Sequence, residues 1–194
     1  MVASAAARRA AQVEQASARK NESAPEPVDP PLSRFGVRQA FDLIDLLSSF
    51  GVARAFASPA ARSRQSLTPW ASMGGGSVTL VESLDLAASG PDAQVDAEAR
   101  LGRVRAFAAE RLREHAAPTV LSVTGCARDA IIEEIRAYAS APVAGAEAPR
   151  LTRGQVLVAH VEHGPDGLVV AALETHGVTT KNPAAHTRRG NKRH

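Results

Sequence analysis

Residues 55–66 read AFASPAARSRQS, and this stretch decides the expected order of the elements around it. The run VARAFA, which ends inside it, is short and apolar and predicts a strand. Ser58 and Pro59 then provide a helix cap and a first-turn proline, so we expect a helix over about residues 60–71. Arg62 falls in the first turn of that helix, where main-chain donors and the helix dipole favour an anion. The stretch therefore predicts a strand and then a helix whose start presents an arginine.

The preceding segment, LSRFGVRQAFDLIDLLSSFG at residues 32–51, predicts a helix of its own. Ser33 has the side chain of an N-cap, and Gly51 stands where a C′ glycine ends a helix. Five apolar residues recur at helical spacing between them: Val37, Ala40, Phe41, Ile44 and Leu47.

Strand and helix patterns alternate after residue 71. We expect a turn in MGGGS (73–77), a strand in SVTLVESL (77–84), a helix from Asp92 to about His115, a strand in PTVLSV (118–123) and a helix in CARDAIIEEIRAYA (126–139). Residues 155–174, QVLVAHVEHGPDGLVVAALE, are two β-rich runs around Pro-Asp-Gly, which predicts an antiparallel hairpin. The expected fold is therefore α/β, a three-layer αβα sandwich with a mainly parallel sheet and a C-terminal antiparallel hairpin.

The length of 194 residues fits one domain with tails. Residues 1–28 are rich in Ala and then in Pro, Glu and Ser, so we expect a flexible segment there. The expected domain covers residues 29–178, and residues 179–194 form a basic tail that we expect to be disordered.

The positive charge of the chain is concentrated in that tail. The net charge is +3, and residues 181–194 hold five cations and no acid, which leaves −2 for the rest. The five cations are Lys181, Arg188, Arg189, Lys192 and Arg193. Such a tail predicts weak, salt-dependent binding to a polyanion, and the alternative is a solvated end that aids solubility.

The remaining composition favours a cytoplasmic globular protein that needs no cofactor. Cys126 is the only cysteine, which excludes an internal disulfide and a multi-cysteine metal site. No apolar run approaches the ~18 residues of a membrane span, and arginines stand where a secretory signal would be apolar. His160 and His163 lie three apart on an expected strand, so they point to opposite faces and are poorly placed to share a metal ion, even with His176 nearby.

Two local motifs stand out in the chain. The first lies in PVDPPLSRFGVRQA, at Leu32, Ser33, Gly36, Gln39 and Ala40. The second lies in ASPAARSRQS, at Ser58, Pro59, Arg62, Gln65 and Ser66. Together they resemble the histidine phosphatase superfamily, the phosphoglycerate-mutase-like fold that includes SixA-type phosphohistidine phosphatases. The resemblance runs from about Asp29 to Val178. The final hairpin is similar to the C-terminal domain of actinobacterial MutT-type Nudix proteins, although this chain has no Nudix box.

The resemblance implies a nucleophilic histidine after the first strand, a second histidine, two arginines and an acid around the transferred phosphoryl group. In this chain Glu14 and Gln15 stand in the places of the first arginine and histidine. Thr124 replaces the second histidine, and the acid position falls on Leu86. The resemblance also implies that residues 10–16 form a central strand from weak strand material; the alternative is a sheet rebuilt without it.

These replacements predict a catalytically degenerate domain, a pseudophosphatase with a binding or regulatory role. The anion-binding candidates that remain are Arg62, Ser58 and the turn at Thr124 and Gly125. The expected partners are a phosphate-bearing small molecule, a phosphoprotein or another protein.

Two alternatives remain open. One is an active phosphohydrolase that uses Cys126 or an activated water, although the phosphate-binding arginine of cysteine phosphatases is replaced here by Ile132. We therefore expect Cys126 to be structural. The other is a nucleic-acid-associated protein that binds through its basic tail.

Overall fold

The computed structural model describes residues 29–86, 97–114, 117–165 and 167–178. The chain divides into two units, Met1–Pro30 and Pro31–His194. Nearly all of the first unit lies outside the described residues, and all of the described helices and strands belong to the second unit. The expected strand at residues 10–16 and the basic tail also lie outside the described residues.

The first expected helix is confirmed as α2, Arg34–Ser49. The Oγ of Ser33 accepts a hydrogen bond from the Gly36 N–H at 3.2 Å and so caps the helix start. Gly51 has a φ of +62°, and its N–H donates to the Ser48 carbonyl at 3.0 Å. The left-handed glycine therefore turns the chain out of the helix and into the first strand.

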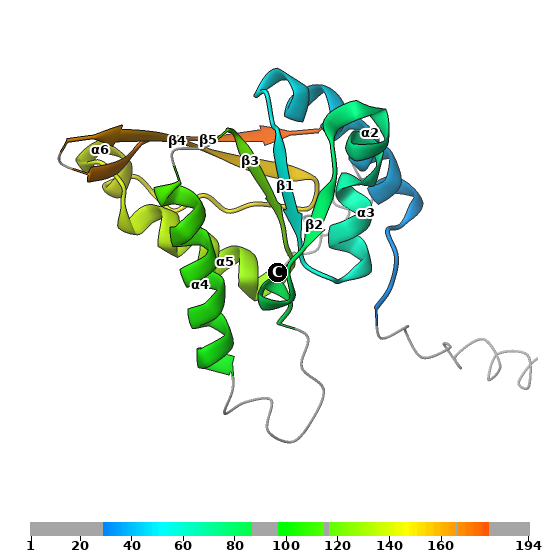
Figure 1. The fold of residues 1–194 in the computed structure, drawn as a ribbon, viewed down its shortest axis with the longest axis horizontal. Coiled ribbons are helices and arrows are strands. Elements are labelled where there is room, and N and C mark those ends of the chain that lie inside the picture. The colour runs from blue at the N-terminus through cyan, green and yellow to red at the C-terminus, as the bar shows by residue number, and fades with distance from the viewer. Residues whose placement is uncertain (1–28, 87–96, 115–116, 166, 179–194) are drawn as a thin grey trace, which may run out of the picture. The chain divides into compact units, whose positions relative to one another are not determined.

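Three strands form the expected parallel sheet, in the order β2-β1-β3. They are β1 (Arg54–Ala57), β2 (Val78–Leu80) and β3 (Thr119–Ser122). The central strand β1 pairs Ala55 with Val78 on one side and with Val120 on the other. A helix lies in each connection between strands, which is what a parallel crossover requires (Figure 1).

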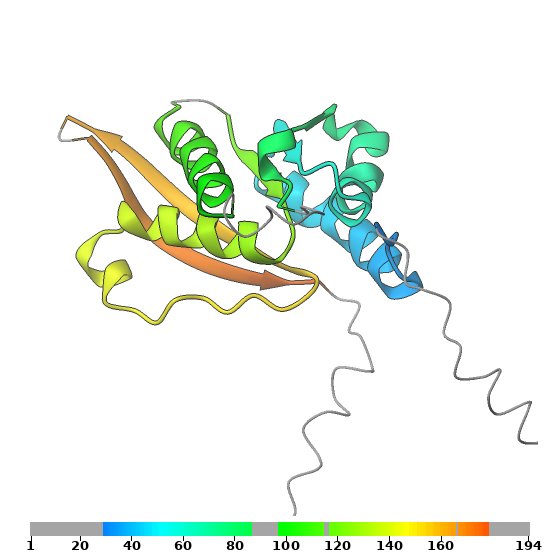
Figure 2. The same ribbon diagram turned by 90° about the horizontal axis from the view of Figure 1, so that it is seen from below.

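Helices cover both faces of this sheet (Figure 2). On one face Ala55 and Ala57 pack with Leu47 of α2 and with Leu67 and Trp70 of α3. On the other face Phe56 packs against a cluster formed by Leu84 and by residues of α4 and α5, which include Val104, Ala108, Ala127 and Ile131. The bounds are Ala61–Trp70 for α3, Ala97–Arg113 for α4 and Gly125–Ala137 for α5. Alternate side chains of β1 thus serve two separate cores.

The expected capping role of Ser58 is wrong. Helix α3 begins at Ala61, its N-cap is Ala60, and no side chain caps it. Ser58 instead extends the sheet, because its N–H donates to the Ser122 carbonyl of β3 at 3.0 Å. Pro59 consequently precedes the N-cap and does not lie in the first turn.

The glycine segment contains the expected turn, whereas the second strand differs from expectation. The segment η1, Ala71–Gly75, follows α3 directly, and Met73 (φ −91°, ψ 17°) and Gly74 (φ +97°, ψ 8°) leave the helical conformation, so the chain turns there. Strand β2 ends at Leu80, and Glu82–Leu84 form a 3-10 turn, η2. This turn directs Leu84 into the α4–α5 core, where it is fully buried.

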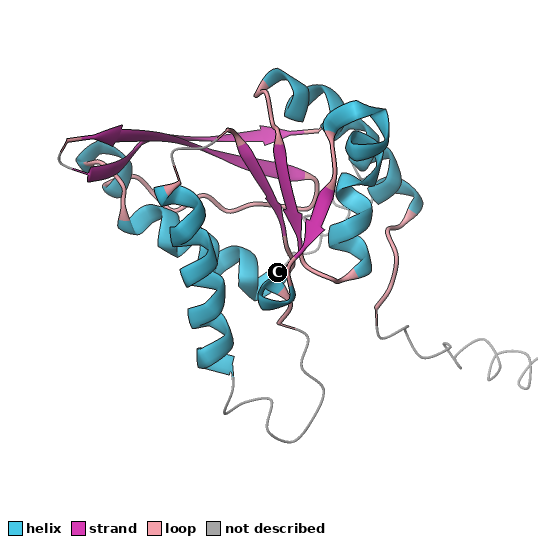
Figure 3. Ribbon diagram, in the orientation of Figure 1, coloured by secondary structure: helices cyan, strands magenta, loops and turns pink. Residues whose placement is uncertain are grey.

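The C-terminal hairpin is confirmed and forms a sheet separate from the parallel one (Figure 3). Strands β4 (Gln155–Gly164) and β5 (Gly167–Gly177) pair antiparallel, with an irregularity after His160. Val170 ties the hairpin to the end of α5, because its N–H donates to the Tyr138 carbonyl at 2.8 Å. The short helix α6, Ala141–Ala144, follows that junction.

Two classes of feature are not found in the part of the chain that the structure describes. None of its helices is long and apolar enough to cross a membrane. No group of three or more His, Cys, Asp or Glu side chains within it is arranged to hold a metal ion.

Candidate functional site

The carboxyl ends of β1 and β3 bring together two helix starts. Strand β1 ends at Ala57 and leads into α3, and β3 ends at Ser122 and leads into α5. Because the two strands are adjacent and parallel, both helices begin at the same end of the sheet. Open α/β sheets bind ligands at this end, where helix N-termini present unpaired N–H groups and positive partial charge.

Arg62 lies where the sequence predicts, in the first turn of α3, and it is exposed. Its carbonyl accepts a hydrogen bond from the Ser66 Oγ at 2.8 Å, so Ser66 bonds back to the helix main chain. Helix α3 has no acidic residue in its first turn to neutralise that end. The Arg62 guanidinium and the helix dipole therefore act in the same direction on a nearby anion.

Three serines gather behind this helix start. Ser58 and Ser63 are 0% and 2% exposed, and neither Oγ has a hydrogen-bond partner among the described residues. Ser122 links them, because its carbonyl accepts from the Ser58 N–H and its Oγ donates to the Ser63 carbonyl at 2.9 Å. A buried hydroxyl without a partner costs about 1–3 kcal/mol, so a pair at one strand end is a feature that calls for a functional explanation.

Ser63 and Ser122 are site residues that the sequence analysis missed. Ser63 lies in the expected helix and Ser122 in the expected strand, and neither is a matched position of a motif. The available signal was the recurrence of serine where two parallel strands end, and it becomes visible only when the order of the strands is known.

Thr124 and Gly125 form the second helix start. Thr124 is the N-cap of α5 through its backbone, since its carbonyl accepts from the Ala127 N–H at 3.1 Å, and its side chain makes no capping bond. Gly125 has a φ of +38°, a conformation that favours glycine. Cys126 follows and its thiol is exposed. The turn therefore offers main-chain donors and an accessible thiol beside the end of β3.

The other motif residues have structural roles. The Gln65 Oε1 accepts from the Leu32 N–H at 2.7 Å and so fixes the chain before α2. The Gln39 amide packs on Gly154, where a Cβ would approach its Nε2 to 2.4 Å. Leu86 packs against the α4–α5 core. Glu14 and Gln15 lie outside the described residues.

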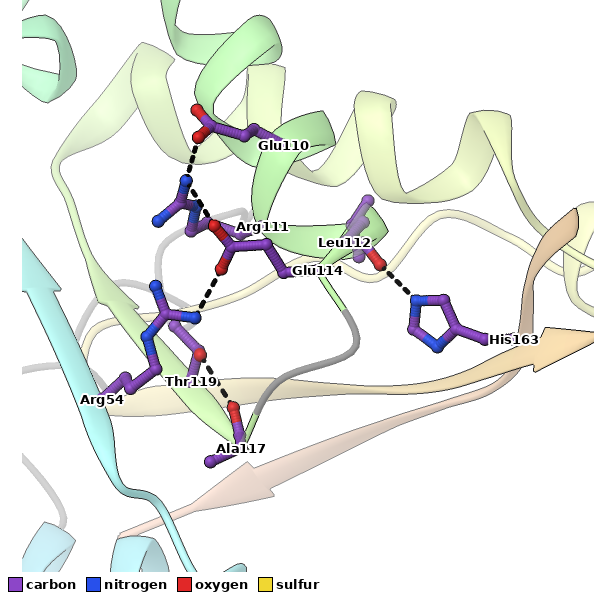
Figure 4. Close-up of polar contacts among 8 residues, drawn as sticks. All are labelled: Arg54, Glu110, Arg111, Leu112, Glu114, Ala117, Thr119 and His163. Carbon is purple, nitrogen blue, oxygen red and sulfur yellow. Dashed lines mark hydrogen bonds and ion pairs between the residues drawn. The ribbon is translucent and has the colours of Figure 1, made fainter.

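An ion-pair network lies at the opposite end of the sheet (Figure 4). The Glu114 carboxylate bridges Arg54 of β1 and Arg111 of α4, and Arg111 also pairs with Glu110. Both guanidinium groups lie over the Phe56 ring, 5.3 and 5.4 Å from its centroid. Two cations and two anions balance within it, so we regard this network as structural.

A second polar cluster lies on one face of the hairpin. The Glu174 carboxylate accepts from His160 and lies 3.0 Å from the Nε2 of His176. These hydrogen bonds, that of His160 foremost, lower the pKa of Glu174 below its ordinary value. Phe50, which caps α2, packs edge-on against both imidazoles. His163 lies apart from this cluster, because its Nε2 bonds to the Leu112 carbonyl of α4 at 2.8 Å (Figure 4).

Comparison with protein families gives a match over residues 8–91 to the histidine phosphatase superfamily, branch 1. No match was found among curated proteins. The solved structure of mycobacterial hydrolase 2 is 16% identical, covers 82% of this chain and 85% of its own, and aligns with a TM-score of 0.53. That likeness shows the fold.

Two further solved structures resemble the chain over a shorter length. A mycobacterial glucosyl-3-phosphoglycerate phosphatase in complex with inorganic phosphate is 19% identical, covers 56% of this chain and 70% of its own, and has a TM-score of 0.45. Mycobacterial hydrolase 1 is 20% identical, covers 60% of this chain and 71% of its own, and also has a TM-score of 0.45.

Proposed function

We propose that this chain, whose residues 8–91 match the histidine phosphatase superfamily, binds a phosphate-bearing ligand without hydrolysing it. The ligand would lie at the carboxyl end of the parallel sheet, against Arg62 and the turn at Thr124 and Gly125. The protein would then act as a pseudophosphatase, a binding or regulatory module for a phosphorylated small molecule or a phosphoprotein.

The observation that carries this proposal is a missing residue type. The family model matches residues 8–91, and the first histidine of the chain is His115. A phosphoryl transfer through histidine needs an imidazole in line with the phosphorus, and none of the matched residues supplies one. Thr124, which takes the place of the second histidine, has no group that could act as a general acid near neutral pH.

The features that remain suit binding. Arg62 provides an exposed cation in the first turn of a ten-residue helix, and α5 begins beside it at the next strand. Ser58 and Ser63 are buried hydroxyls with no partner in the described part of the chain, directly behind that helix start. An arginine with converging helix N-termini recognises phosphate by charge and by main-chain N–H groups.

Thermal unfolding of the purified protein tests the proposal directly. The ligands are inorganic phosphate, vanadate, phosphoserine, phosphohistidine and a set of nucleotides, each with wild type and with Arg62→Ala. A ligand present at about 100 times its dissociation constant adds about 2.7 kcal/mol, which raises Tm by about 5–10 °C for a domain of this size. We expect at least one ligand to stabilise the wild type and to leave Arg62→Ala unchanged.

Arg103→Ala is the matched control, because Arg103 is also an exposed helical arginine but lies on α4. It removes the same charge and should keep the full ligand shift. Stabilisation that is equally lost in both variants would reflect net charge alone and would contradict a site at Arg62. The absence of any shift in the wild type would also contradict the proposal.

An active phosphohydrolase is the second candidate, and the exposed thiol of Cys126 at the start of α5 is the observation that favours it. Helix N-termini stabilise thiolates, which are the nucleophilic form of cysteine. Phosphomonoester turnover that persists through purification and is abolished by Cys126→Ser would establish this second candidate. Absence of turnover in the wild type would exclude it.

A further inference from the structure

One side of α2 carries a stripe of exposed residues that runs along most of the helix. Residues three and four positions apart share one face of an α-helix, and six exposed residues of α2 lie at this spacing. They are Arg34, Val37, Arg38, Phe41, Asp45 and Ser48, and we call them the α2 stripe. Another side of α2 packs through Leu47 on β1 and α3 (Figure 2).

The middle of the α2 stripe is apolar. Phe41 is 55% exposed and Val37 is 43% exposed, although both belong to the apolar pattern that predicts the helix. They are four residues apart, so their side chains are neighbours on the helix surface. Covering them with a partner would remove apolar area from water, which is favourable by about 25 cal/mol per Å². The stripe therefore has the apolar centre of a contact surface.

Opposite charges lie on the two sides of this centre. Arg38 lies about one turn before Phe41, and Asp45 lies about one turn after it. Both are exposed, and within the described residues neither is in an ion pair or a side-chain hydrogen bond. The helix dipole favours acids near the start of a helix and bases near its end, which is the reverse of this order. The stability of α2 alone therefore does not account for the two charges.

We propose that the α2 stripe is the interface through which two copies of this chain form a weak dimer. The two α2 helices would run antiparallel across a twofold axis near Phe41. Arg38 would then lie opposite Asp45 of the partner subunit, and Asp45 opposite the partner's Arg38. The Phe41 rings of the two copies would meet between these two ion pairs.

The charge pattern selects a second copy as the occupant. An interface across a twofold axis uses the same surface twice, so each charge needs its complement on that same surface. Arg38 and Asp45 meet this condition for antiparallel helices, whereas a parallel pair would oppose like charges. A single helix face offers less area than stable interfaces, which bury about 1,200–2,000 Å², so we expect a Kd of about 0.1 mM. None of the stripe residues belongs to the proposed phosphate site, so the dimer does not depend on the proposed function.

Sedimentation equilibrium of the full chain at low salt, up to about 1 mM protein, tests the proposal with charge reversals. Arg38→Asp and Asp45→Arg each bring like charges together twice, so each should weaken the dimer about tenfold. Both changes place charge where the helix dipole favours it, so both variants should fold. Both substitutions in one chain make the facing charges opposite again and should restore the wild-type association.

A mixture of the two single variants is the sharpest test. In a heterodimer of an Arg38→Asp chain and an Asp45→Arg chain, the two introduced residues face each other, and the native Asp45 of one chain faces the native Arg38 of the other. We expect the mixture to associate as strongly as the wild type, although each variant alone associates weakly. A wild type that stays monomeric up to about 1 mM would overturn the proposal. A mixture and a double variant as weak as the single variants would also overturn it.

Two further comparisons locate the contact. Arg103→Asp makes the same change of charge at an exposed position of α4 and should leave the association unchanged; a loss equal to that of Arg38→Asp would reflect net charge alone and contradict the proposal. Phe41→Ser should abolish the dimer, whereas Leu80→Ser, which removes a 49% exposed side chain from β2, should retain it. Loss in Leu80→Ser with retention in Phe41→Ser would place the contact at the sheet edge and overturn the assignment to the α2 stripe.

Discussion

At the scale of single residues, Leu84 contributes to the fold from an unexpected position. It ends the run that the sequence assigns to a strand, yet it lies in the η2 turn and is fully buried between α4 and α5. Truncation of a buried leucine to alanine removes apolar contacts and leaves a cavity, which costs about 2–5 kcal/mol. We therefore expect Leu84→Ala to lower the free energy of unfolding by that amount in urea titrations.

Leu80 provides the comparison for this prediction. It is 49% exposed at the end of the edge strand β2. Leu80→Ala should change stability by less than about 1 kcal/mol, because half of its side chain is already in water. Equal effects of the two truncations would mean that Leu84 does not occupy the α4–α5 core.

The lowered pKa of Glu174 predicts that the stability of the fold depends on pH. The hydrogen bond from His160, with that of His176, lowers the pKa of Glu174 below 4.5, its ordinary value. A carboxyl whose pKa is lower in the folded protein stabilises the fold above its unfolded pKa, and this contribution is lost as pH falls through the folded pKa. Glu174→Gln should therefore destabilise the protein at pH 7, and its difference from the wild type should shrink as pH falls below about 4.5.

The measurement is urea unfolding followed by circular dichroism between pH 3 and pH 7. Glu162→Gln is the control, because Glu162 is an exposed carboxylate on the same hairpin. A difference between wild type and Glu174→Gln that stays constant down to pH 3 would contradict the assigned pKa shift.

At the scale of elements, the junction of α3 with η1 requires a residue without a side chain at position 75. Gly75 lies against the Trp70 ring, and its Cβ would come within 2.1 Å of the indole. Gly75→Ala must therefore displace the turn or the ring, and overpacking of this kind costs about 1–3 kcal/mol. We expect a lower Tm and a changed Trp70 emission spectrum for Gly75→Ala.

For Gly102 we expect substitution by alanine to have the opposite effect on Tm. It lies inside α4, is exposed, and has nothing within 4 Å of its Cβ position. Alanine at an exposed helical position stabilises by about 0.5–1 kcal/mol relative to glycine, so Gly102→Ala should raise Tm. If Gly75→Ala proved as harmless as Gly102→Ala, the described packing of Gly75 on Trp70 would be wrong.

At the scale of the whole molecule, local signals were enough to predict most of the fold. The serine cap and glycine stop of α2, the alternation that gives a parallel sheet, and the Pro-Asp-Gly hairpin all act through neighbouring residues. Patterns of this kind are visible in the sequence because the physical causes act over a few residues.

The predictions from the sequence are wrong where a contact with a segment distant in the sequence determines the local structure. Ser58 has the side chain of a cap, but its N–H bonds to Ser122 of β3, and this draws it into the sheet. Leu84 lies in a turn and not in the strand, because its side chain packs in the core formed with α4 and α5. The position of Arg62 in its helix was predictable, whereas the buried pair Ser58 and Ser63 depended on the order of strands.

The uneven charge of the chain leads to a further prediction. We propose that residues 181–194, which carry a net charge of +5, mediate weak binding to polyanions. Their removal changes the net charge from +3 to −2, so the truncated protein should no longer be retained on heparin at low salt. Retention of the truncated protein at the same salt concentration would place the contact elsewhere.

The central claim is that the domain binds phosphate esters and does not cleave them, and ³¹P NMR of the protein mixed with an equimolar phosphomonoester tests both parts in one sample. We use whichever ester stabilises the wild type in thermal unfolding. The account predicts that its resonance shifts or broadens with wild type and not with Arg62→Ala, while no inorganic phosphate resonance grows over hours. Growth of inorganic phosphate in proportion to the protein, persisting through purification, would contradict the account and make this domain an enzyme.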